Sequence, residues 1–224
     1  MGTLAEERSE RLARMRLYVI TGDRGDVAET ATIVEAALAG GADVIQLRKK
    51  TMPKDQQYRL AVLLRDLTRA RDALLIVNDH PDLAIAADAD GVHLGQDDFP
   101  PRMIRSLHGF TGRLLGRSTH SLEQALAGVA DGVDYLGVGP VYGTPTKAGR
   151  PAVGCDLVRE VAAGVDLPFV AIGGIDAATA PSVLAAGARA IAVVRAVYDA
   201  PDPQEAARRL RELVTLTSRP AVTA

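Results

Sequence analysis

Eight short apolar runs, each followed by a stretch with helical spacing, constrain the fold of this chain more than any other feature of its sequence. Strands that are buried on both faces appear as continuous apolar runs, and a repeated strand–helix order implies parallel pairing with helical crossovers. Eight such units in about 200 residues are typical of a single (β/α)8 barrel, the TIM barrel of the α/β class. The sequence therefore predicts this fold, with its chemistry at the carboxyl ends of the strands.

The predicted barrel occupies residues 17–217, between an N-terminal extension of residues 1–16 and a flexible tail of residues 218–224. The extension carries a mixed-charge run, which predicts either a helix that caps the bottom of the barrel or a disordered segment. No change in composition marks a second domain. The apolar runs predict strands over residues 17–21, 44–48, 74–78, 91–94, 114–117, 135–138, 169–172 and 190–194.

Composition limits the classes of partner. The formal net charge is −2, so no global field would attract nucleic acid or an anionic membrane, and we expect small-molecule partners. No apolar stretch reaches the roughly 20 residues of a membrane span, and the N-terminus lacks the apolar core of a signal peptide. The single cysteine, Cys155, excludes an intramolecular disulfide and is compatible with a reducing cytoplasm, the compartment that we expect. The sequence leaves the oligomeric state open, a homo-oligomer included.

Polar side chains alternate at the end of the second apolar run. Gln46, Arg48 and Lys50 point the same way along an extended strand. Leu47 and Lys49, which lie between them, point the other way. The alternative is a solvated strand end, but Arg48 lies where the run should still be buried, and a buried cation without an anion is costly. A phosphate-bearing ligand is the natural counter-charge, because arginine can fork onto phosphate.

Carboxylates follow the third and fourth apolar runs, at Asp79 and at Asp97-Asp98. Adjacent strand ends of a barrel lie within reach of one hard cation, and carboxylates with phosphate oxygens are the usual ligands of Mg2+. Helix capping is the alternative, because each acidic residue lies just before a predicted helix. Beside the cluster of cations, metal binding is the better hypothesis for Asp79 and for one of Asp97 and Asp98.

A second anion site is expected on the loops after the sixth and seventh runs. The loop 139–154 is long, and its segment 143–147 combines glycine, hydroxyls and Lys147, which suits an anion or a polarised heterocycle on a lid. Gly173-Gly174 lies where barrels bind phosphate through backbone N–H groups. The alternatives are a surface loop that happens to contain a lysine, and a glycine pair that makes a tight turn.

The histidines and the cysteine are weaker candidates. His120 lies at the predicted mouth and is either a general base or, as we favour, a solvated loop residue. His93 lies within a short run and is better interpreted as a hydrogen-bonded core residue. Cys155 has no base near it in sequence and is expected at the start of the sixth helix. Ser121, with Gln124 three residues on, predicts a capping box.

Together, these motifs resemble those of the thiamine-phosphate synthase family over residues 17–216. The resemblance rests on five motifs in the family's order, each at a strand end. They are Gln46-Leu47-Arg48-Lys49-Lys50, Asn78-Asp79, residues 90–96 (DGVHLGQ), residues 116–120 (GRSTH) and residues 137–147 (GVGPVYGTPTK). The resemblance implies a barrel enzyme that joins hydroxymethylpyrimidine diphosphate to hydroxyethylthiazole phosphate and releases pyrophosphate.

The resemblance also implies a role for each matching residue. The pyrimidine diphosphate would be held by Gln46, Leu47, Arg48, Lys49, Lys50, Asn78, Ser118 and Lys147. The thiazole phosphate would be held by Thr144, Pro145, Thr146, Gly174, Val194 and Arg195. Asp79 and Asp98 would bind Mg2+, whereas Asp97 would not. The catalytic residues would be Arg48, Lys50, Lys147 and Ser118, with the cations stabilising the departing pyrophosphate while the aminopyrimidine stabilises a carbocation-like transition state.

One departure from the family and two rival functions stand beside this interpretation. Many family members carry serine where this chain has Arg195, whose side chain either adds a phosphate contact or points to solvent. A thiazole tautomerase, a barrel relative with a similar Gly-Arg-Ser-x-His stretch, would use His120 to move a proton. A non-catalytic phosphate-sensing barrel would need only one anion cluster. Asp79, Asp98 and Lys147 argue against the tautomerase, because an isomerase binds neither pyrophosphate nor Mg2+.

Overall fold

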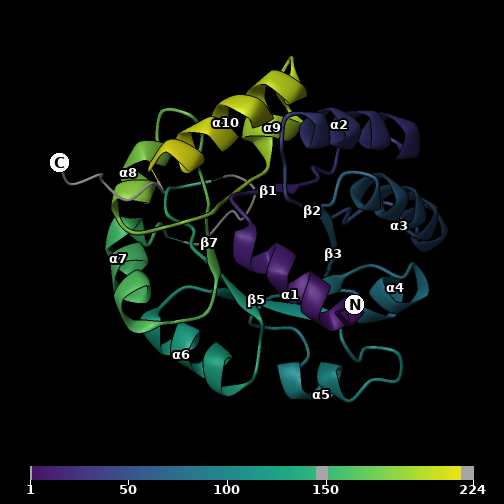
Figure 1. The fold of residues 1–224 in the computed structure, drawn as a ribbon, viewed down its shortest axis with the longest axis horizontal. Coiled ribbons are helices and arrows are strands. Elements are labelled where there is room, and N and C mark those ends of the chain that lie inside the picture. Colours follow the sequence, from purple (N-terminus) through teal and green to yellow (C-terminus); the bar gives the residue numbers. More distant parts are fainter. Residues whose placement is uncertain (1, 145–150, 218–224) are drawn as a thin grey trace.

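The computed structural model describes residues 2–144 and 151–217. Its parallel strands form a closed barrel in which each strand pairs with the next along the chain and β8 pairs with β1. The helices surround this barrel (Figure 1). The strands are β1 (Leu17–Ile20), β2 (Val44–Leu47), β3 (Leu74–Asn78), β4 (Gly91–Leu94), β5 (Leu114–Thr119), β6 (Tyr135–Val138), β7 (Phe169–Ile172) and β8 (Ile191–Val193).

Helices follow the strands in the order that a (β/α)8 barrel requires, so the predicted fold is confirmed. An additional helix precedes β1. The helices are α1 (Leu4–Arg14), α2 (Val27–Ala39), α3 (Lys54–Arg69), α4 (Pro81–Ala86), α5 (Pro101–Arg105), α6 (Leu122–Ala130), α7 (Gly154–Gly164), α8 (Ala180–Ala185), α9 (Arg195–Tyr198) and α10 (Pro203–Thr217). Cys155 lies at the start of α7, as expected.

The strands agree with the predicted ranges except at a few ends. β2 stops at Leu47, one residue early, because the N–H of Arg48 donates to the hydroxyl of Thr21 at 2.8 Å. β5 instead continues to Thr119, which stays in register with β6. These two ends matter for the site, since Arg48 and the last residues of β5 both lie at the mouth of the barrel.

Apolar residues form two clusters, one on each side of the barrel wall. The larger cluster packs the outward-facing strand residues, Leu47 among them, against the surrounding helices. The smaller cluster fills the interior of the barrel and includes Tyr18, Leu74, Ile76 and Tyr135. This division follows from the alternation of side chains along each strand.

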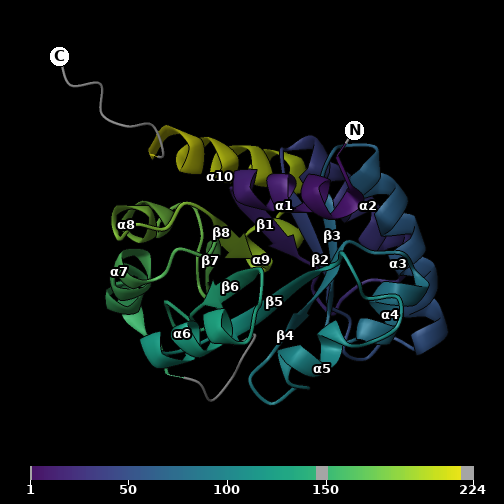
Figure 2. The ribbon, with the colours of Figure 1, turned by 60° about the horizontal axis from the view of Figure 1, so that its bottom comes forward.

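The N-terminal extension forms α1, which closes the amino end of the barrel (Figures 1 and 2). Arg8 reaches from α1 to Asp90, with its Nε donating to Oδ1 at 2.9 Å, and both side chains are buried. The second oxygen of Asp90 accepts the N–H of Leu75 at 2.9 Å. Leu12 and Met15 belong to the interior cluster. The helical interpretation of the extension is therefore correct, and α1 is part of the folded core.

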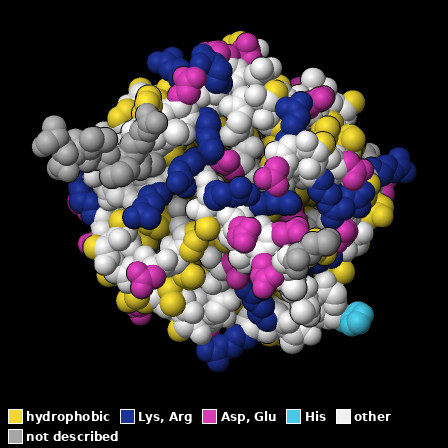
Figure 3. All heavy atoms as spheres, in the orientation of Figure 1, with side chains coloured by type: hydrophobic (Ala, Val, Ile, Leu, Met, Phe, Trp, Pro, Cys, Tyr) yellow, Lys and Arg dark blue, Asp and Glu magenta, His cyan; other side chains and the backbone are white. Residues whose placement is uncertain are grey.

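Charges of both signs are interspersed on the face around α1 (Figure 3). Arg11 and Arg14 of α1, for example, pair with Asp72 at 2.8 and 3.3 Å. This face shows no extended area of one sign, in agreement with the small net charge. Among the described helices, none has the length and apolar character needed to cross a bilayer.

Candidate active site

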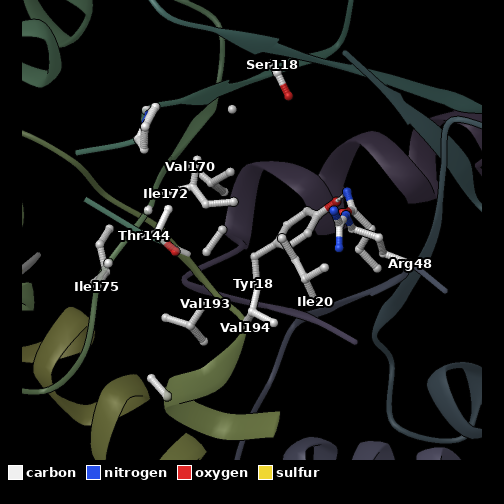
Figure 4. Close-up of a pocket in the computed structure, with 18 of the residues that line it drawn as sticks. Tyr18, Ile20, Arg48, Ser118, Thr144, Val170, Ile172, Ile175, Val193 and Val194 are labelled. Atoms are coloured by element: carbon white, nitrogen blue, oxygen red, sulfur yellow. Dashed lines mark hydrogen bonds between the residues drawn. The ribbon is translucent and has the colours of Figure 1, made fainter. Parts of the chain in front are cut away.

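A cavity of about 320 Å³ opens at the carboxyl ends of the strands (Figure 4). Its walls come from all parts of the barrel, so residues far apart in sequence face one space. The predicted site residues that line it are Gln46, Arg48, Asn78, Ser118, Thr144, Gly174, Val194 and Arg195. The location is the one at which barrel enzymes build their active sites.

Arg48 is a buried cation in the wall of this cavity. Its side chain is 9% exposed, and its ion-pair partner, Asp23, lies 3.7 Å away and is 44% exposed. Thr21 holds the Arg48 backbone on both sides, accepting its N–H at 2.8 Å and donating to its carbonyl at 3.1 Å. The distant Asp23 carboxylate, together with the weaker electrostatic effect between Arg48 and Asp79, compensates only in part for the desolvation of a guanidinium. The position therefore favours an anionic ligand.

The neighbours of this arginine do not share its orientation. Leu47 packs in the outer core cluster. Lys49 turns toward α9, where its Nζ donates to the hydroxyl of Tyr198 at 3.0 Å and to carbonyls of the loop after β1. Burial lowers the pKa of the Lys49 amine. Lys50 is exposed beyond the end of β2. The side chains of Leu47 and Lys49 thus point away from the cavity, as the alternation along the strand predicts, and the assignment of these two residues to the diphosphate site stays a prediction.

Two carboxyl groups meet at the ends of β3 and β4. Asp98 turns back toward its strand, accepting the N–H of Gly95 at 2.6 Å, and its side chain is hydrogen-bonded to Asp79. Burial, followed by the charge of Asp98, raises the pKa of Asp79 to about 6, against the opposing effects of Asn78 and Arg48. Asp79 also adopts a left-handed backbone conformation (φ 61°), which residues other than glycine rarely adopt.

This pair of carboxyl groups fits a hard cation. Two acidic side chains that are held together and partly desolvated repel each other, and a divalent ion would remove that repulsion. The described part of the chain, this pair included, contains no group of three or more histidine, cysteine or acidic side chains that could hold a metal. A cation at Asp79 and Asp98 would therefore complete its shell with phosphate oxygens and water, as Mg2+ commonly does.

The capping alternative for these acidic residues is wrong. α4 begins after His80 and α5 begins after Pro100, and neither helix has a side-chain cap. The expectation that Asp97 caps the second of these helices is therefore corrected. Proline in the first turn of each helix already lacks one of the N–H groups that a cap would satisfy.

The loop after β7 forms the far side of the cavity. Gly173 and Gly174 have φ values of 103° and 65°. A Cβ on Gly174 would lie 2.7 Å from the Cβ of Tyr142, so only glycine fits where this loop packs on the loop after β6. The glycine pair is thus required by backbone conformation, and it leaves the main chain open to a ligand.

The remaining predicted residues of the far side come from two further loops. Val194 and Arg195 lie at the start of α9 and line the cavity, with the Arg195 side chain exposed. Thr144 lines it from the loop after β6 and lies across the cavity from Arg48 in Figure 4. Pro145, Thr146 and Lys147 lie outside the described residues.

His120 lines the cavity at the end of β5 as an anchored imidazole. Its backbone N–H donates to the side-chain oxygen of Gln124 at 2.8 Å, and its Nδ1 is hydrogen-bonded to the carbonyl of Gly139. Because a carbonyl only accepts, Nδ1 carries the proton of the neutral ring. Ser121 accepts the N–H of Gln124 at 3.2 Å, so the predicted capping box is half formed. Its other half is absent because the Gln124 side chain serves His120 instead.

Apolar residues that the sequence did not single out complete the wall. Ile20, Val170, Ile172 and Val193 all line the cavity. They lie within apolar runs, whose pattern indicates burial but not which inward position meets a ligand. Ile20, Val170 and Ile172 belong to the interior cluster or pack against it, whereas Val193 belongs to the outer cluster. Their place at the carboxyl ends of the strands distinguishes these residues, and it depends on exactly where each strand ends. They offer a flat apolar surface for an uncharged ring.

Comparison with known proteins agrees with this geometry. Residues 17–197 match a family described as thiamine monophosphate synthase. A thiamine-phosphate synthase of Mycolicibacterium vanbaalenii is 46% identical over 217 residues, which is 92% of this chain and 97% of that protein. One of Chloroflexus aurantiacus is 49% identical over 211 residues, covering 92% and 96%. The solved thiamine phosphate pyrophosphorylase of Pyrococcus furiosus has a TM-score of 0.83 and 37% identity, covering 97% of this chain and all of its own.

Proposed function

Because the chain belongs to the thiamine monophosphate synthase family, we propose that it joins 4-amino-2-methyl-5-(diphosphooxymethyl)pyrimidine to hydroxyethylthiazole phosphate. The products are thiamine phosphate and pyrophosphate. One observation carries this proposal: a single cavity is lined by the buried Arg48 on one wall and by the glycine pair and Arg195 on the opposite wall. Arg48 and the paired carboxyl groups lie at β2, β3 and β4, whereas the glycine pair follows β7, four strands from β3 in either direction.

The proposal assigns one substrate to each wall. Gln46, Arg48, Asn78 and Ser118 line the side of the cavity that would take the pyrimidine diphosphate. In the proposal, Lys50 and Lys147 would also bind this substrate. Gly174, Val194, Arg195 and Thr144 line the side of the cavity that would take the thiazole phosphate. In the proposal, Pro145 and Thr146 would also bind this substrate. Asp79 and Asp98 would hold Mg2+, whose charge would offset that of the diphosphate. Arg195, being exposed at the rim, is free to reach a phosphate that its backbone N–H alone would otherwise bind.

The proposed chemistry is a dissociative substitution. The bond between the pyrimidine methylene and the diphosphate oxygen breaks, pyrophosphate leaves with the electron pair, and the thiazole nitrogen forms the new bond to the methylene. The aminopyrimidine ring stabilises the developing cation. Arg48, Lys50 and Lys147 stabilise the leaving pyrophosphate, and Ser118 orients the ring, so catalysis is positioning and preorganised charge without a covalent nucleophile. The small-molecule substrates and the reducing environment suited to a lone thiol support a cytoplasmic location.

The test is product formation with both substrates and Mg2+, followed by chromatography. A synthase forms thiamine phosphate. A tautomerase would leave the diphosphate intact while it isomerised a thiazole carboxylate phosphate, and a phosphate-sensing module would bind one ligand and form nothing. Absence of thiamine phosphate from a folded sample would refute the proposal.

Asp98→Ala should lower turnover and raise the Mg2+ concentration needed for half-maximal activity by at least roughly tenfold, while the fold is kept. The reason is the loss of one of two carboxyl groups at the proposed cation site. Asp97→Ala is the matched control, one residue away, and should change both quantities little. Equal effects of the two substitutions would contradict the assignment of Asp98.

Metal affinity should depend on pH through Asp79. Its pKa is raised to about 6, so a proton competes with the cation below that value, and affinity should fall by about tenfold per unit as the pH drops further. Without metal, the folded protein holds the Asp79 proton more tightly than the unfolded chain does. The stability that results is present at low pH and should be lost as the pH rises through about 6. Electron paramagnetic resonance of Mn2+ as a probe ion would measure the affinity. An affinity that stays constant down to about pH 5 would contradict the assignment of Asp79 as a ligand.

His120→Ala should retain most of the coupling activity, within about tenfold, because the proposed reaction at the pyrimidine methylene requires no proton transfer by histidine. The residual loss reflects the contact of its Nδ1 with the carbonyl of Gly139. Steady-state kinetics with both substrates would measure it. A fall of about 10³ in kcat with unchanged KM values would indicate an acid–base role and favour the tautomerase-like use of this residue.

A further inference from the structure

A continuous chain of hydrogen bonds crosses the barrel just below the cavity, where the cavity meets the interior core. The Gln46 Nε2 donates to the Tyr18 hydroxyl at 2.8 Å, and the hydroxyls of Tyr18 and Tyr135 lie 2.9 Å apart. The Tyr135 hydroxyl lies 3.1 Å from Nδ1 of His93, and Nε2 of His93 lies 3.0 Å from Oγ of Ser118. The five members come from β2, β1, β6, β4 and β5 in that order. Both ends of the chain, Gln46 and Ser118, line the cavity.

The direction of every hydrogen bond in this chain follows from counting protons. An amide nitrogen only donates, so Tyr18 accepts from Gln46 and must place its single proton on Tyr135. Tyr135 then donates to Nδ1 of His93. In the reverse order, the buried Tyr18 proton would have no acceptor among the hydrogen bonds of the described residues. His93 is therefore a neutral ring with its proton on Nε2, and it donates to Ser118.

This direction decides what the cavity offers at each end. Ser118 accepts from His93, so its own proton is directed to an acceptor in the cavity. Gln46 uses its amide nitrogen on Tyr18, so its carbonyl oxygen is the group left for a donor. The side chain of Gln96 fixes the Ser118 backbone by donating to its carbonyl at 2.6 Å. On the side of the cavity that would take the pyrimidine, Gln46 thus presents an acceptor and Ser118 presents a donor.

The tyrosines keep this direction fixed at all ordinary pH values. Both are fully buried, and burial raises the pKa of each hydroxyl well above its usual value. Neither becomes a phenolate, which would accept from both sides and reverse the order. The rings also pack against one another and against His93, with centroids 6.1 and 5.5 Å apart, so rotation about the chain is restricted.

We propose that Tyr18, Tyr135 and His93 are positioning residues that set the hydrogen-bond polarity of the cavity, so that it selects an aminopyrimidine over the corresponding oxopyrimidine. A ring amino group donates to the Gln46 carbonyl, and an unprotonated ring nitrogen accepts from Ser118. An oxo group at the amino position would place two acceptors against each other. This inference rests on the proposed function and adds to it the basis on which the pyrimidine is chosen.

The first test is the tautomer of His93, read from nitrogen-15 shifts and couplings of histidine-labelled protein. His93→Gln assigns the signal by its disappearance. We expect the proton on Nε2, with Nδ1 unprotonated. A proton on Nδ1, or a doubly protonated ring at neutral pH, would overturn the proposed polarity. This measurement needs no substrate, so it stands even if the protein fails to form thiamine phosphate.

The second test is the ratio of kcat/KM for the aminopyrimidine diphosphate to that for its 4-oxo analogue. Tyr135→Phe removes one hydroxyl from the middle of the chain, and the ratio should fall by at least roughly tenfold, because the two ends lose their fixed roles. Tyr18→Phe should act in the same direction. KM for the thiazole phosphate should not change. A ratio is independent of the fraction of enzyme that is folded, so loss of stability alone cannot produce the result.

Tyr198→Phe is the matched control. Tyr198 is also fully buried, and its hydroxyl is hydrogen-bonded to Thr30 at 3.0 Å, but it lies outside the chain. This variant should keep the wild-type ratio. An unchanged ratio in Tyr135→Phe, or an equal fall in Tyr198→Phe, would overturn the inference. Wild-type protein that couples neither substrate would instead refute the proposed function.

Discussion

Replacing Arg48 with methionine should lower kcat by about 10²–10³, equivalent to roughly 3–4 kcal/mol, without lowering Tm. The guanidinium is a preorganised donor that meets the leaving pyrophosphate in the proposed reaction. Its only ion pair in the described structure is the 3.7 Å contact with Asp23, so the folded protein gains little from the charge. Methionine keeps most of the apolar stem and removes the desolvation cost, and Tm should therefore stay level or rise.

Steady-state kinetics and thermal unfolding of the same preparation would check both parts of this expectation. Arg59→Met is the matched control, because Arg59 lies on the exposed face of α3 and pairs with Asp55, its one ion-pair partner among the described residues. It should leave kcat and Tm unchanged. A clear fall in Tm for Arg48→Met with kcat preserved would show that Arg48 serves the fold rather than the reaction.

Replacing Arg8 with methionine should destabilise the protein by about 3–5 kcal/mol. The substitution leaves Asp90 as a buried carboxylate whose side chain is 7% exposed and whose charged partner, at 2.9 Å, has been removed. It also loosens α1 over the amino end of the barrel, where Leu12 and Met15 contribute to the interior cluster. The protein that remains folded should keep its kcat, because this end of the barrel is remote from the site.

Urea unfolding would measure the free energy of unfolding for this variant. Arg11→Met is the control on the same helix. Its partner, Asp72, is 63% exposed, so its loss should cost less than about 1 kcal/mol. Adding Asp90→Asn to Arg8→Met should recover part of the stability, because a neutral amide is less costly to bury than an unpaired carboxylate. A loss for Arg8→Met as small as that for Arg11→Met would contradict the role given to α1.

The fold was predictable from the sequence because burial on both faces makes barrel strands continuous and apolar. The ends of those strands were less predictable. β2 ends before Arg48 because the hydroxyl of Thr21, on a different strand end, accepts its N–H, and no local pattern contains that contact. The same early end leaves Lys50 exposed beyond the strand, where alternation had predicted that it points the same way as Gln46 and Arg48. Lys49 packs against Tyr198, away from the site, as alternation predicted.

The candidate site was predictable where a side chain is chemically unusual for its position. Arg48 is unusual because it is a cation within an apolar run. Asp79 and Asp98 are unusual because they are carboxylates that follow two neighbouring runs. The polar chain through Tyr18 and Tyr135 did not, because a tyrosine in a strand is ordinarily a core residue and its hydroxyl partner lies far along the chain. His93 was correctly interpreted as a hydrogen-bonded core residue, but its two partners could be identified only in three dimensions.

The central claim is that two phosphate-bearing molecules react within one cavity. Pyrophosphate release tests this claim most directly. Release would be measured from the pyrimidine diphosphate in Mg2+, with and without the thiazole phosphate, alongside thiamine phosphate formation. We predict one pyrophosphate for each thiamine phosphate, and release that is at least roughly tenfold slower when the thiazole phosphate is omitted. Equal release without the thiazole phosphate, or none with both substrates present, would contradict the account.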